Sequence, residues 1–282
     1  MSQLATARTQ KGSWGRIWSD VGPAGRASLV AVALLLFAAS FGPAINPRSG
    51  YDIDPRNRFA PPSWEHWMGT DEVGRDLFSR VLLGTRISLM VAGTSLLIAV
   101  SVGLILGTVS GYVGGAVDEL IMRITDLFLS VPTFILALVI ASTLGPGTWN
   151  AAIAIGIAWW PQYARLVRGQ VLATKANDYV EAARALGAGS ARIAVRHVLA
   201  NSYSPIVIKM TLDVGTAILI TAGLSFIGLG SQPPTPDWGT MIATARPYIF
   251  SAPWYPTIIG FAILVTVSAF TMAGDALQDV AP

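Results

Sequence analysis

Two ionisable residues, Lys209 and Asp213, stand near the start of a long apolar stretch of the sequence. Their spacing of four residues puts both side chains on one face of a helix. Charged groups at membrane depth are costly unless they are paired, and they often mark functional positions. The pattern therefore leaves two alternatives: a self-neutralising ion pair, or a site in which Asp213 lines a pathway and contacts an amino group of a solute.

Other chemistry is sparse in this chain. The sequence has no Cys and two His, so it cannot build a thiolate or His-cluster metal site by itself. It also lacks the G-x-x-x-x-G-K-[ST] loop whose backbone N–H groups and Lys cradle nucleotide phosphates. We expect no metal, no bound cofactor and no enzymatic activity in this chain, and any ATP must be bound by another chain.

The composition indicates whether the folded chain is surrounded by water or by lipid. Of its 282 residues, 52% are hydrophobic and 12% are charged, which is about half the usual charged share of a soluble domain. A helix needs roughly 20 apolar residues to cross a bilayer. The uncharged runs that meet this length are 27–47, 87–117, 127–164, 214–236 and 254–274.

The third run is too long for one crossing, and the turn signal GPGTWN at 145–150 divides it. The sequence thus predicts an all-α integral membrane protein with six transmembrane helices. A cleavable signal peptide is the alternative for the first run, but the run exceeds the usual apolar core of about 7 to 15 residues. The expected spans are 27–46, 87–112, 124–144, 149–167, 204–228 and 254–274.

The Lys and Arg residues near the span ends indicate the orientation. Ten of them fall in the segments that would share one side of the membrane, against seven on the other side. Because cytoplasmic loops carry the excess of Lys and Arg, we expect both termini in the cytoplasm of a multi-pass cell-membrane protein. The cytoplasmic parts are then 1–26, 168–203 and 275–282, and 47–86 is an extracytoplasmic loop. His66 and His197 would lie on opposite sides, which argues against an integral-membrane enzyme.

The cytoplasmic segment 168–203 contains a short amphipathic stretch, ANDYVEAARALGAGS. Asn177 or Asp178 can cap a helix that Gly187 and Gly189 end. Tyr179, Ala182, Ala183 and Leu186 would share one small apolar face, with Glu181 on a flank. Such a face suits a cleft on a partner protein, and a helix lying on the membrane surface is the alternative.

The sequence EAARALGAGSARIAVRHVLANSYSPI resembles the cytoplasmic EAA loop of ATP-binding-cassette importer permeases. Glu181, Ala182, Ala183 and Gly187 match the most characteristic positions of that loop. The resemblance implies that the helix at 178–187, between spans four and five, is a coupling helix that docks on an ATPase subunit. One departure is Ala200, where the family usually has proline, so the chain could bend later, at Pro205.

Four further motifs are similar to the second, C-type permease subunit of the dipeptide, oligopeptide and nickel importer family. They begin at Met68 (MGTDEVGRDLFSRVLLGTRISL), Met122 (MRITDLFLSVP), Leu224 (LSFIGLGSQPPTPDWGTMI) and Gly274 (GDALQDVAP). The resemblance covers nearly the whole chain from about residue 25.

This family resemblance implies a set of partners: a homologous permease subunit, two ATP-binding subunits that hold ATP and Mg, and an extracytoplasmic solute-binding protein. Lipid is expected around the spans, and nucleic acid is not. Di- or oligopeptides are the expected solutes, with nickel or another small solute as the alternative. An ion-coupled secondary carrier is the competing class, although only Asp126 and Asp213 could serve as its intramembrane carboxylates.

Two packing features can also be predicted. Gly103, Gly107 and Gly111 recur every four residues and would form a smooth ridge that another helix can approach closely. The segment around residues 77–86 reads as an amphipathic stretch along the outer surface before span two. The proline-rich loop that begins at Ser231 could form an interfacial or re-entrant turn; the resemblance suggests that it faces a substrate-delivery protein outside, and a rigid cap packed on neighbouring spans is the alternative.

Overall fold

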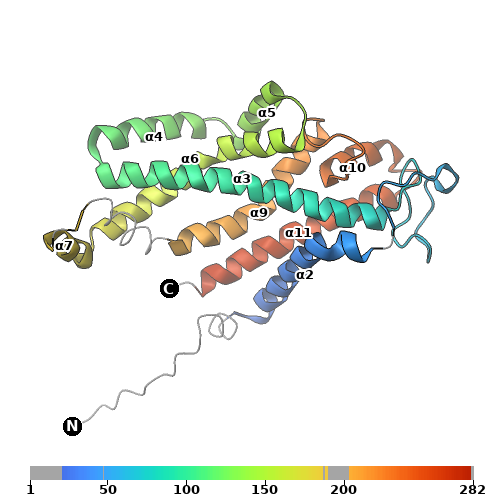
Figure 1. Cartoon of the computed structure of the whole chain (residues 1–282), viewed down its shortest axis with the longest axis horizontal. Helices are drawn as coiled ribbons and strands as arrows, with labels where there is room; N and C mark the ends of the chain where they lie inside the picture. The colour runs from blue at the N-terminus through green and yellow to red at the C-terminus, as the bar shows by residue number, and fades with distance from the viewer. Residues whose placement is uncertain (1–20, 47, 187, 190–202, 281–282) are drawn as a thin grey trace, which may run out of the picture.

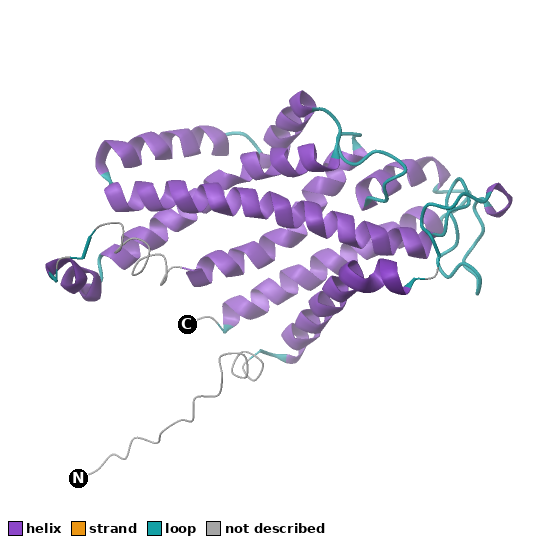
Figure 2. Cartoon of the chain, viewed as in Figure 1, coloured by secondary structure: helices purple, strands orange, loops and turns teal. Residues whose placement is uncertain are grey.

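The protein is all-helical wherever it is described. The computed structural model describes residues 21–46, 48–186, 188–189 and 203–280, and within these ranges it contains no β-strand, only an isolated bridge between Thr70 and Asp76. Figure 2 shows helices joined by short connections, with one longer loop gathered at one end of the molecule. The expectation of an all-α membrane protein is thereby confirmed.

The long helices form an elongated bundle (Figure 1). The pair α3 and α6 makes the most extensive helix contact, and α9, α11 and α2 follow beside it, each packed on the next. The helices of the bundle are α2 (Pro23–Ile45), α3 (Leu77–Val113), α4 (Gly115–Leu129), α5 (Thr133–Leu144), α6 (Thr148–Lys175), α9 (Tyr203–Phe226) and α11 (Trp254–Asp279).

Short elements occupy the two ends of this bundle. Helix α7 (Asp178–Ala185) lies at one end of the bundle. The first residues of α2 and the last residues of α11 are directed toward the same end. Helix α10 (Trp238–Ala245), the 3-10 turns η1 (Pro55–Asn57) and η4 (Arg246–Tyr248), and the 46–76 loop lie at the other. The start of α2 and the end of α11 therefore share a side with α7, as the topology requires.

Four helices, α2, α3, α9 and α11, are long and apolar enough to cross a membrane, and the α4–α5 pair could make a fifth crossing. Helix α6 falls outside this set because its second half carries Arg165, Arg168 and Lys175. It is nevertheless the helix that the others surround: Ile155, Trp159 and Tyr163 are all buried. That α6 is a sixth span stays a prediction.

The expected single helix over 124–144 is wrong. The chain there forms α4 and α5, which meet at an angle of 88° across a short break. The break falls at residues 130–132, where Pro132 disfavours the helical conformation of Val131 and offers no N–H of its own. The motif DLFLSVP therefore specifies a bent segment.

The segment expected before span two is part of the long helix α3 itself. Leu77 starts a continuous 37-residue helix, and Leu77, Arg80 and Val81 are buried in it. At 1.5 Å per residue such a helix is about 55 Å long, well beyond a bilayer core of about 30 Å. The first turns of α3 are therefore buried, and the 46–76 loop and α10 pack against them.

The glycine ridge of α3 is confirmed. A Cβ at Gly103 would overlap Tyr163 Cβ, and one at Gly107 would lie 2.5 Å from the carbonyl oxygen of Ala164. A Cβ at Gly111 would lie 2.8 Å from Val171 Cγ1. The missing side chains let the backbones of α3 and α6 approach more closely than any other residue would allow.

The loop after α9 packs as a cap. Trp238 is buried, and its indole Nε1–H donates to the carbonyl oxygen of Val81 at 3.2 Å. Met241 and Ala245, on the same helix α10, are buried as well. Of the alternatives for this loop, the contacts favour the rigid cap.

Candidate functional site

Helix α7 is a short helix with backbone hydrogen bonds that extend beyond both of its ends. It begins at Asp178, directly after Asn177, whose carbonyl oxygen accepts the N–H of Val180 at 2.9 Å. The N–H groups of Leu186 and Ala188 donate to Ala182 and Ala183, which closes the last turn. The helix observed here is a little shorter than the 178–187 expected, and Gly187 lies outside the described residues.

The apolar face predicted for this helix points away from the bundle. Tyr179 is 43% exposed and Leu186 is 89% exposed, and Ala182 is exposed between them. Ala183 is half-buried, and Glu181 is exposed on the flank. A face of two large apolar side chains and small alanines is thus presented at one end of the molecule.

Val180 is the residue of this helix that the sequence reasoning missed. It is fully buried and packs in a small cluster with Val167 and Val171 of α6 and Ile206 of α9. Val180 therefore places α7 in the same apolar cluster as residues of both long helices. The available signal was that Val180 is apolar and lies off the face shared by Tyr179 and Leu186, about 100° from Tyr179 around the helix.

Part of the EAA-like stretch cannot be placed. Residues 190–202, which include His197 and Ala200, lie outside the described residues. The effect of Ala200 in place of the usual proline stays open, and α9 is described from Tyr203 onward.

Lys209 and Asp213 lie in contact on α9. Lys209 Nζ is 2.9 Å from one carboxylate oxygen of Asp213 and 3.2 Å from the other. The Tyr163 hydroxyl of α6 donates to the same carboxylate at 2.7 Å, and Lys209 Nζ lies 5.4 Å from the centre of the Tyr163 ring. The side chain of Lys209 is 29% exposed and that of Asp213 only 12% exposed. Asp213 is thus enclosed by its partners, and Lys209 is the more accessible of the two.

This ion pair extends to the break between α4 and α5. Lys209 Nζ also contacts Gln162 Oε1 at 3.4 Å, and Gln162 Nε2 lies 3.5 Å from the hydroxyl of Thr133, the first residue of α5. Three helices therefore meet through one chain of polar side chains. Tyr163 and Gln162 come from a segment more than 40 residues away, so spacing along the sequence could not have identified them.

A second charged contact ties α4 to α6 near the end that carries α7. Arg168 Nε and Nη2 lie 2.5 and 2.6 Å from the two carboxylate oxygens of Asp118, a bidentate geometry. Lys175, at the end of α6, donates to the carbonyl oxygen of Tyr112 of α3 at 2.7 Å. These contacts hold α3, α4 and α6 together beside α7.

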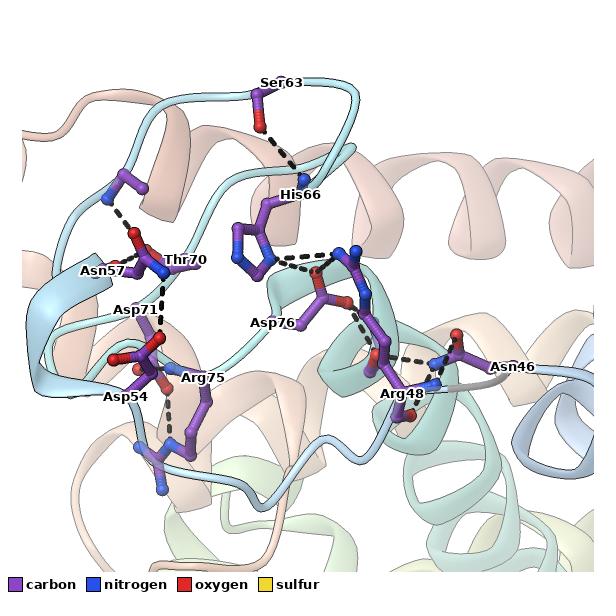
Figure 3. A network of polar contacts seen from close by, with 12 residues as sticks. Asn46, Arg48, Asp54, Asn57, Ser63, His66, Thr70, Asp71, Arg75 and Asp76 are labelled. Carbon is purple, nitrogen blue, oxygen red and sulfur yellow. Dashed lines mark hydrogen bonds and ion pairs between the residues drawn. The ribbon is translucent and has the colours of Figure 1, made fainter.

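The 46–76 loop is built around a polar network at the opposite end (Figure 3). Arg75 Nε lies 2.6 Å from the buried carboxylate of Asp71, and Arg75 Nη2 lies 2.8 Å from Glu72. The hydroxyl of Tyr255, near the start of α11, donates to Glu72 at 2.6 Å. The motif GTDEVGRD therefore anchors the loop to both α3 and α11.

Asp76 is the residue in this network that starts α3. It accepts from the backbone N–H and the hydroxyl of Ser79, at 2.9 and 2.6 Å, and lies 2.9 Å from His66 Nδ1. Burial alone would raise the pKa of Asp76, but the hydrogen bonds from Ser79 and His66 outweigh it and hold the pKa below its ordinary value. Asp76 thus stays an anion that caps the long helix.

A bundle with four helices long and apolar enough to cross a membrane is typical of a multi-pass membrane protein. Residues 103–281 match the family model described as "Binding-protein-dependent transport system inner membrane component". The chain belongs to this family, the permease subunits of ATP-binding-cassette importers.

Curated relatives agree over nearly the whole chain. The probable D,D-dipeptide transport system permease protein DdpC of Escherichia coli (strain K12) is 43% identical over 90% of this chain and 85% of its own length. The dipeptide transport system permease protein DppC of Alkalihalophilus pseudofirmus is 42% identical over 89% of this chain and 83% of its own length. The nickel transport system permease protein NikC of Escherichia coli (strain K12) is 39% identical over 90% and 92%.

A solved structure shares the fold. The chain is similar to one from the inward-facing MetNI methionine ABC transporter, with a TM-score of 0.59 and 20% identity. The match covers 73% of this chain and 98% of that chain. At this identity the likeness supports the helical arrangement alone.

Proposed function

We propose that this chain is the C-type permease subunit of an importer for di- or oligopeptides, and that it forms half of the translocation pathway. The observation that carries the proposal is the pair of dipeptide-system permeases, 43% and 42% identical over about nine tenths of the chain. In this proposal α6 joins the four clearly apolar helices and the α4–α5 pair as a sixth span, with both termini in the cytoplasm.

Helix α7 is the proposed site of coupling to an ATPase subunit. Asp178, Tyr179, Glu181, Ala182, Ala183, Leu186 and Gly187 are the residues expected to dock. Their support is the exposed face of Tyr179 and Leu186 and the buried anchor Val180 on the other side of the helix. Closure of the ATPase pair would move α7, and Val180 would pass the movement to α6 and α9. The spans would then alternate between outward and inward openings.

The contacts of Lys209 and Asp213 favour the self-neutralising pair over a solute site at Asp213. Both carboxylate oxygens of Asp213 already face donors, and the pair joins α6, α9 and the start of α5. We assign the pair a structural role in the proposal: it fastens together the helices that must move as a unit. The alternative, contact with a peptide amino group, is left to the uptake assay described in the Discussion.

The proposed assembly contains a homologous permease subunit, two ATP-binding subunits that hold ATP and Mg, and an extracytoplasmic binding protein. ATP hydrolysis belongs to the partners. Nickel is the second candidate solute, because NikC covers the chain as fully as the peptide permeases do, at 39% identity.

Uptake by the assembled complex tests the function. The chain and the subunits encoded beside it are co-expressed, purified and reconstituted in vesicles with the binding protein outside and ATP inside. We expect ATP-dependent uptake of a labelled dipeptide or oligopeptide and none of radioactive nickel. Uptake of nickel alone would reassign the solute, and purification without any ATP-binding subunit would overturn the importer proposal.

A further inference from the structure

A groove of about 450 Å³ opens between α2, the start of α3 and the 46–76 loop. Phe37, Ala38 and Gly42 of α2 line one wall, and Phe78 and Leu82 of α3 line the other. Trp67 covers it from the loop, with its ring 5.1 Å from that of Phe78. The volume falls within the range of small-molecule sites, about 300 to 1,000 Å³.

The groove continues onto a surface that a bilayer would cover. Helix α2 is the least buried of the candidate spans, with 11% of its apolar window buried. Phe37 is 52% exposed and Phe41, whose ring lies 5.0 Å from that of Phe37, is 54% exposed. At the rim of the groove Trp64 is 97% exposed and Trp67 66% exposed, as expected of aromatic side chains at a membrane interface. An acyl chain beside α2 could therefore enter the groove without leaving apolar surroundings.

The lining of the groove carries charges of both signs. The Arg48 side chain is 42% exposed, and its Nη1 is 3.8 Å from Asp76, a carboxylate already engaged by Ser79 and His66 (Figure 3). Glu65 also lines the groove, is exposed, and makes no hydrogen bond or ion pair within the described part of the chain. The groove thus presents a cation with exposed N–H groups and a carboxylate that has no partner among the described residues.

We propose that this groove binds one phospholipid with a zwitterionic ethanolamine headgroup. The phosphate oxygens would accept hydrogen bonds from Arg48, the ammonium group would donate to Glu65, and one acyl chain would lie against Phe37, Phe78 and Leu82. One lipid molecule would then contact Arg48, Glu65 and the apolar walls of the groove. A purely anionic lipid would leave Glu65 unpaired and facing a like charge, and a choline headgroup has no N–H to donate.

The test uses the chain purified in detergent with its co-expressed partner subunits. The complex is stripped of lipid, and phosphatidylethanolamine, phosphatidylcholine or phosphatidylglycerol is added back, with bound lipid counted by native mass spectrometry. We expect one phosphatidylethanolamine per copy of this chain, bound about fivefold more tightly than the other two lipids, the size expected of one solvent-exposed charge pair. Equal binding of the three lipids would overturn the proposal.

Two pairs of variants locate the bound lipid. Ala38→Trp fills the groove and should abolish retention, whereas Ala33→Trp, an exposed alanine on α2 outside the groove, should keep it. Glu65→Gln has no internal contact to lose among the described residues, so it should fold normally and bind the ethanolamine and choline lipids equally. Asp52→Asn, in the same loop, should keep the preference.

Retention that is identical in the two tryptophan variants would overturn the site. A photoreactive residue placed at Trp67 separates lipid from protein occupants: we expect a lipid adduct. An adduct with another protein subunit would overturn the proposal, because the groove would then be a protein interface.

Discussion

Asp76 shows how one carboxylate sets the start of the longest helix. It satisfies the N–H of Ser79 in the first turn of α3 and is itself held as an anion by Ser79 and His66. An acidic residue at a helix N-terminus also interacts favourably with the helix dipole. The 46–76 loop and the helix therefore depend on the charge of the same side chain.

Asp76→Asn should lower the stability of the protein at neutral pH, and the difference should become smaller in acid. The pKa of Asp76 is lowered in the folded chain, so its contribution is present above the ordinary value of 3.8 and is lost as the pH falls through the lowered pKa. Asp76→Ala should cost more, about 1 kcal/mol, because the cap is lost as well. Thermal melting of the purified chain at pH 7 and pH 3 measures both effects.

Asp52→Asn is the control for this titration. Asp52 is exposed in the same loop, and no contact of its side chain is seen in the described part of the chain. Its melting curve should follow that of the unaltered protein at both pH values. An Asp76→Asn variant that also follows the unaltered protein at pH 7 would contradict the role of the charge.

The Lys209–Asp213 pair predicts a stability loss that a second change should repair. Asp213→Asn leaves the ammonium of Lys209 without its carboxylate, which should cost about 1 to 3 kcal/mol. Adding Lys209→Met removes the orphaned charge, and Tyr163 can still donate to the amide oxygen of the new residue. Melting temperature and uptake should both recover in the double variant. Recovered stability with uptake still lost would show that the pair contacts the solute.

The same pair shows what could be predicted from the sequence at this scale. Its contact follows from a spacing of four in a helix, which is a local rule. Tyr163 and Gln162 reach it from α6 because of how two distant helices pack. Similarly, Tyr179 and Leu186 were correctly expected on one face, but the anchoring role of Val180 depends on Val167, Val171 and Ile206.

At the scale of helices, the α3–α6 contact depends on glycine. Gly107→Ala should destabilise the protein by about 1 to 3 kcal/mol or more, because the added Cβ would lie 2.5 Å from a carbonyl oxygen that cannot move independently. Gly93→Ala, on the same helix, meets nothing within 4 Å and should stabilise by about 0.5 to 1 kcal/mol. Melting temperatures of the two variants give the comparison, and equal shifts would contradict the role of close packing.

Some helix boundaries follow from the sequence pattern, and others depend on tertiary structure. The glycine ridge was predictable because it repeats every four residues, and the apolar runs located α2, α9 and α11 to within a few residues. The 124–144 segment was read by hydropathy alone, which does not register the backbone restriction that Pro132 imposes on Val131. The 77–86 segment was predicted to be an amphipathic surface stretch because charged residues, Arg80 among them, surround apolar residues at helical spacing. In the structure Arg80 is buried with its guanidinium near Asp71 and donates to the carbonyl oxygen of Gly50 at 3.0 Å.

At the scale of the whole molecule, the two ends have different characters. The end with α10 is tied down by the Asp71–Arg75–Glu72–Tyr255 network and the buried Trp238. The end with α7 presents exposed side chains, and the buried Val180 packs there with residues of α6 and α9. An input applied at α7 would thus reach the long helices from one end, while the network at the opposite end keeps α3 and α11 in place.

Ala182→Trp tests whether α7 is the place where ATP hydrolysis is coupled to transport. The indole would stand on the exposed face between Tyr179 and Leu186 and hold a docking partner away. We expect uptake to fall at least about tenfold, as the loss of a well-packed interface contact of about 1.4 kcal/mol or more requires. Ala173→Trp, an exposed alanine on α6 ahead of α7, is the matched control and should transport normally.

Uptake, ATPase activity and the amount of co-purified ATP-binding subunit are measured on the same preparations. If the ATPase subunit docks on α7, Ala182→Trp should lose both uptake and the co-purified ATP-binding subunit, and Ala173→Trp should lose neither. If both variants transport alike, the energy must enter through another surface, and Val180 would then be a packing residue without a role in transmission.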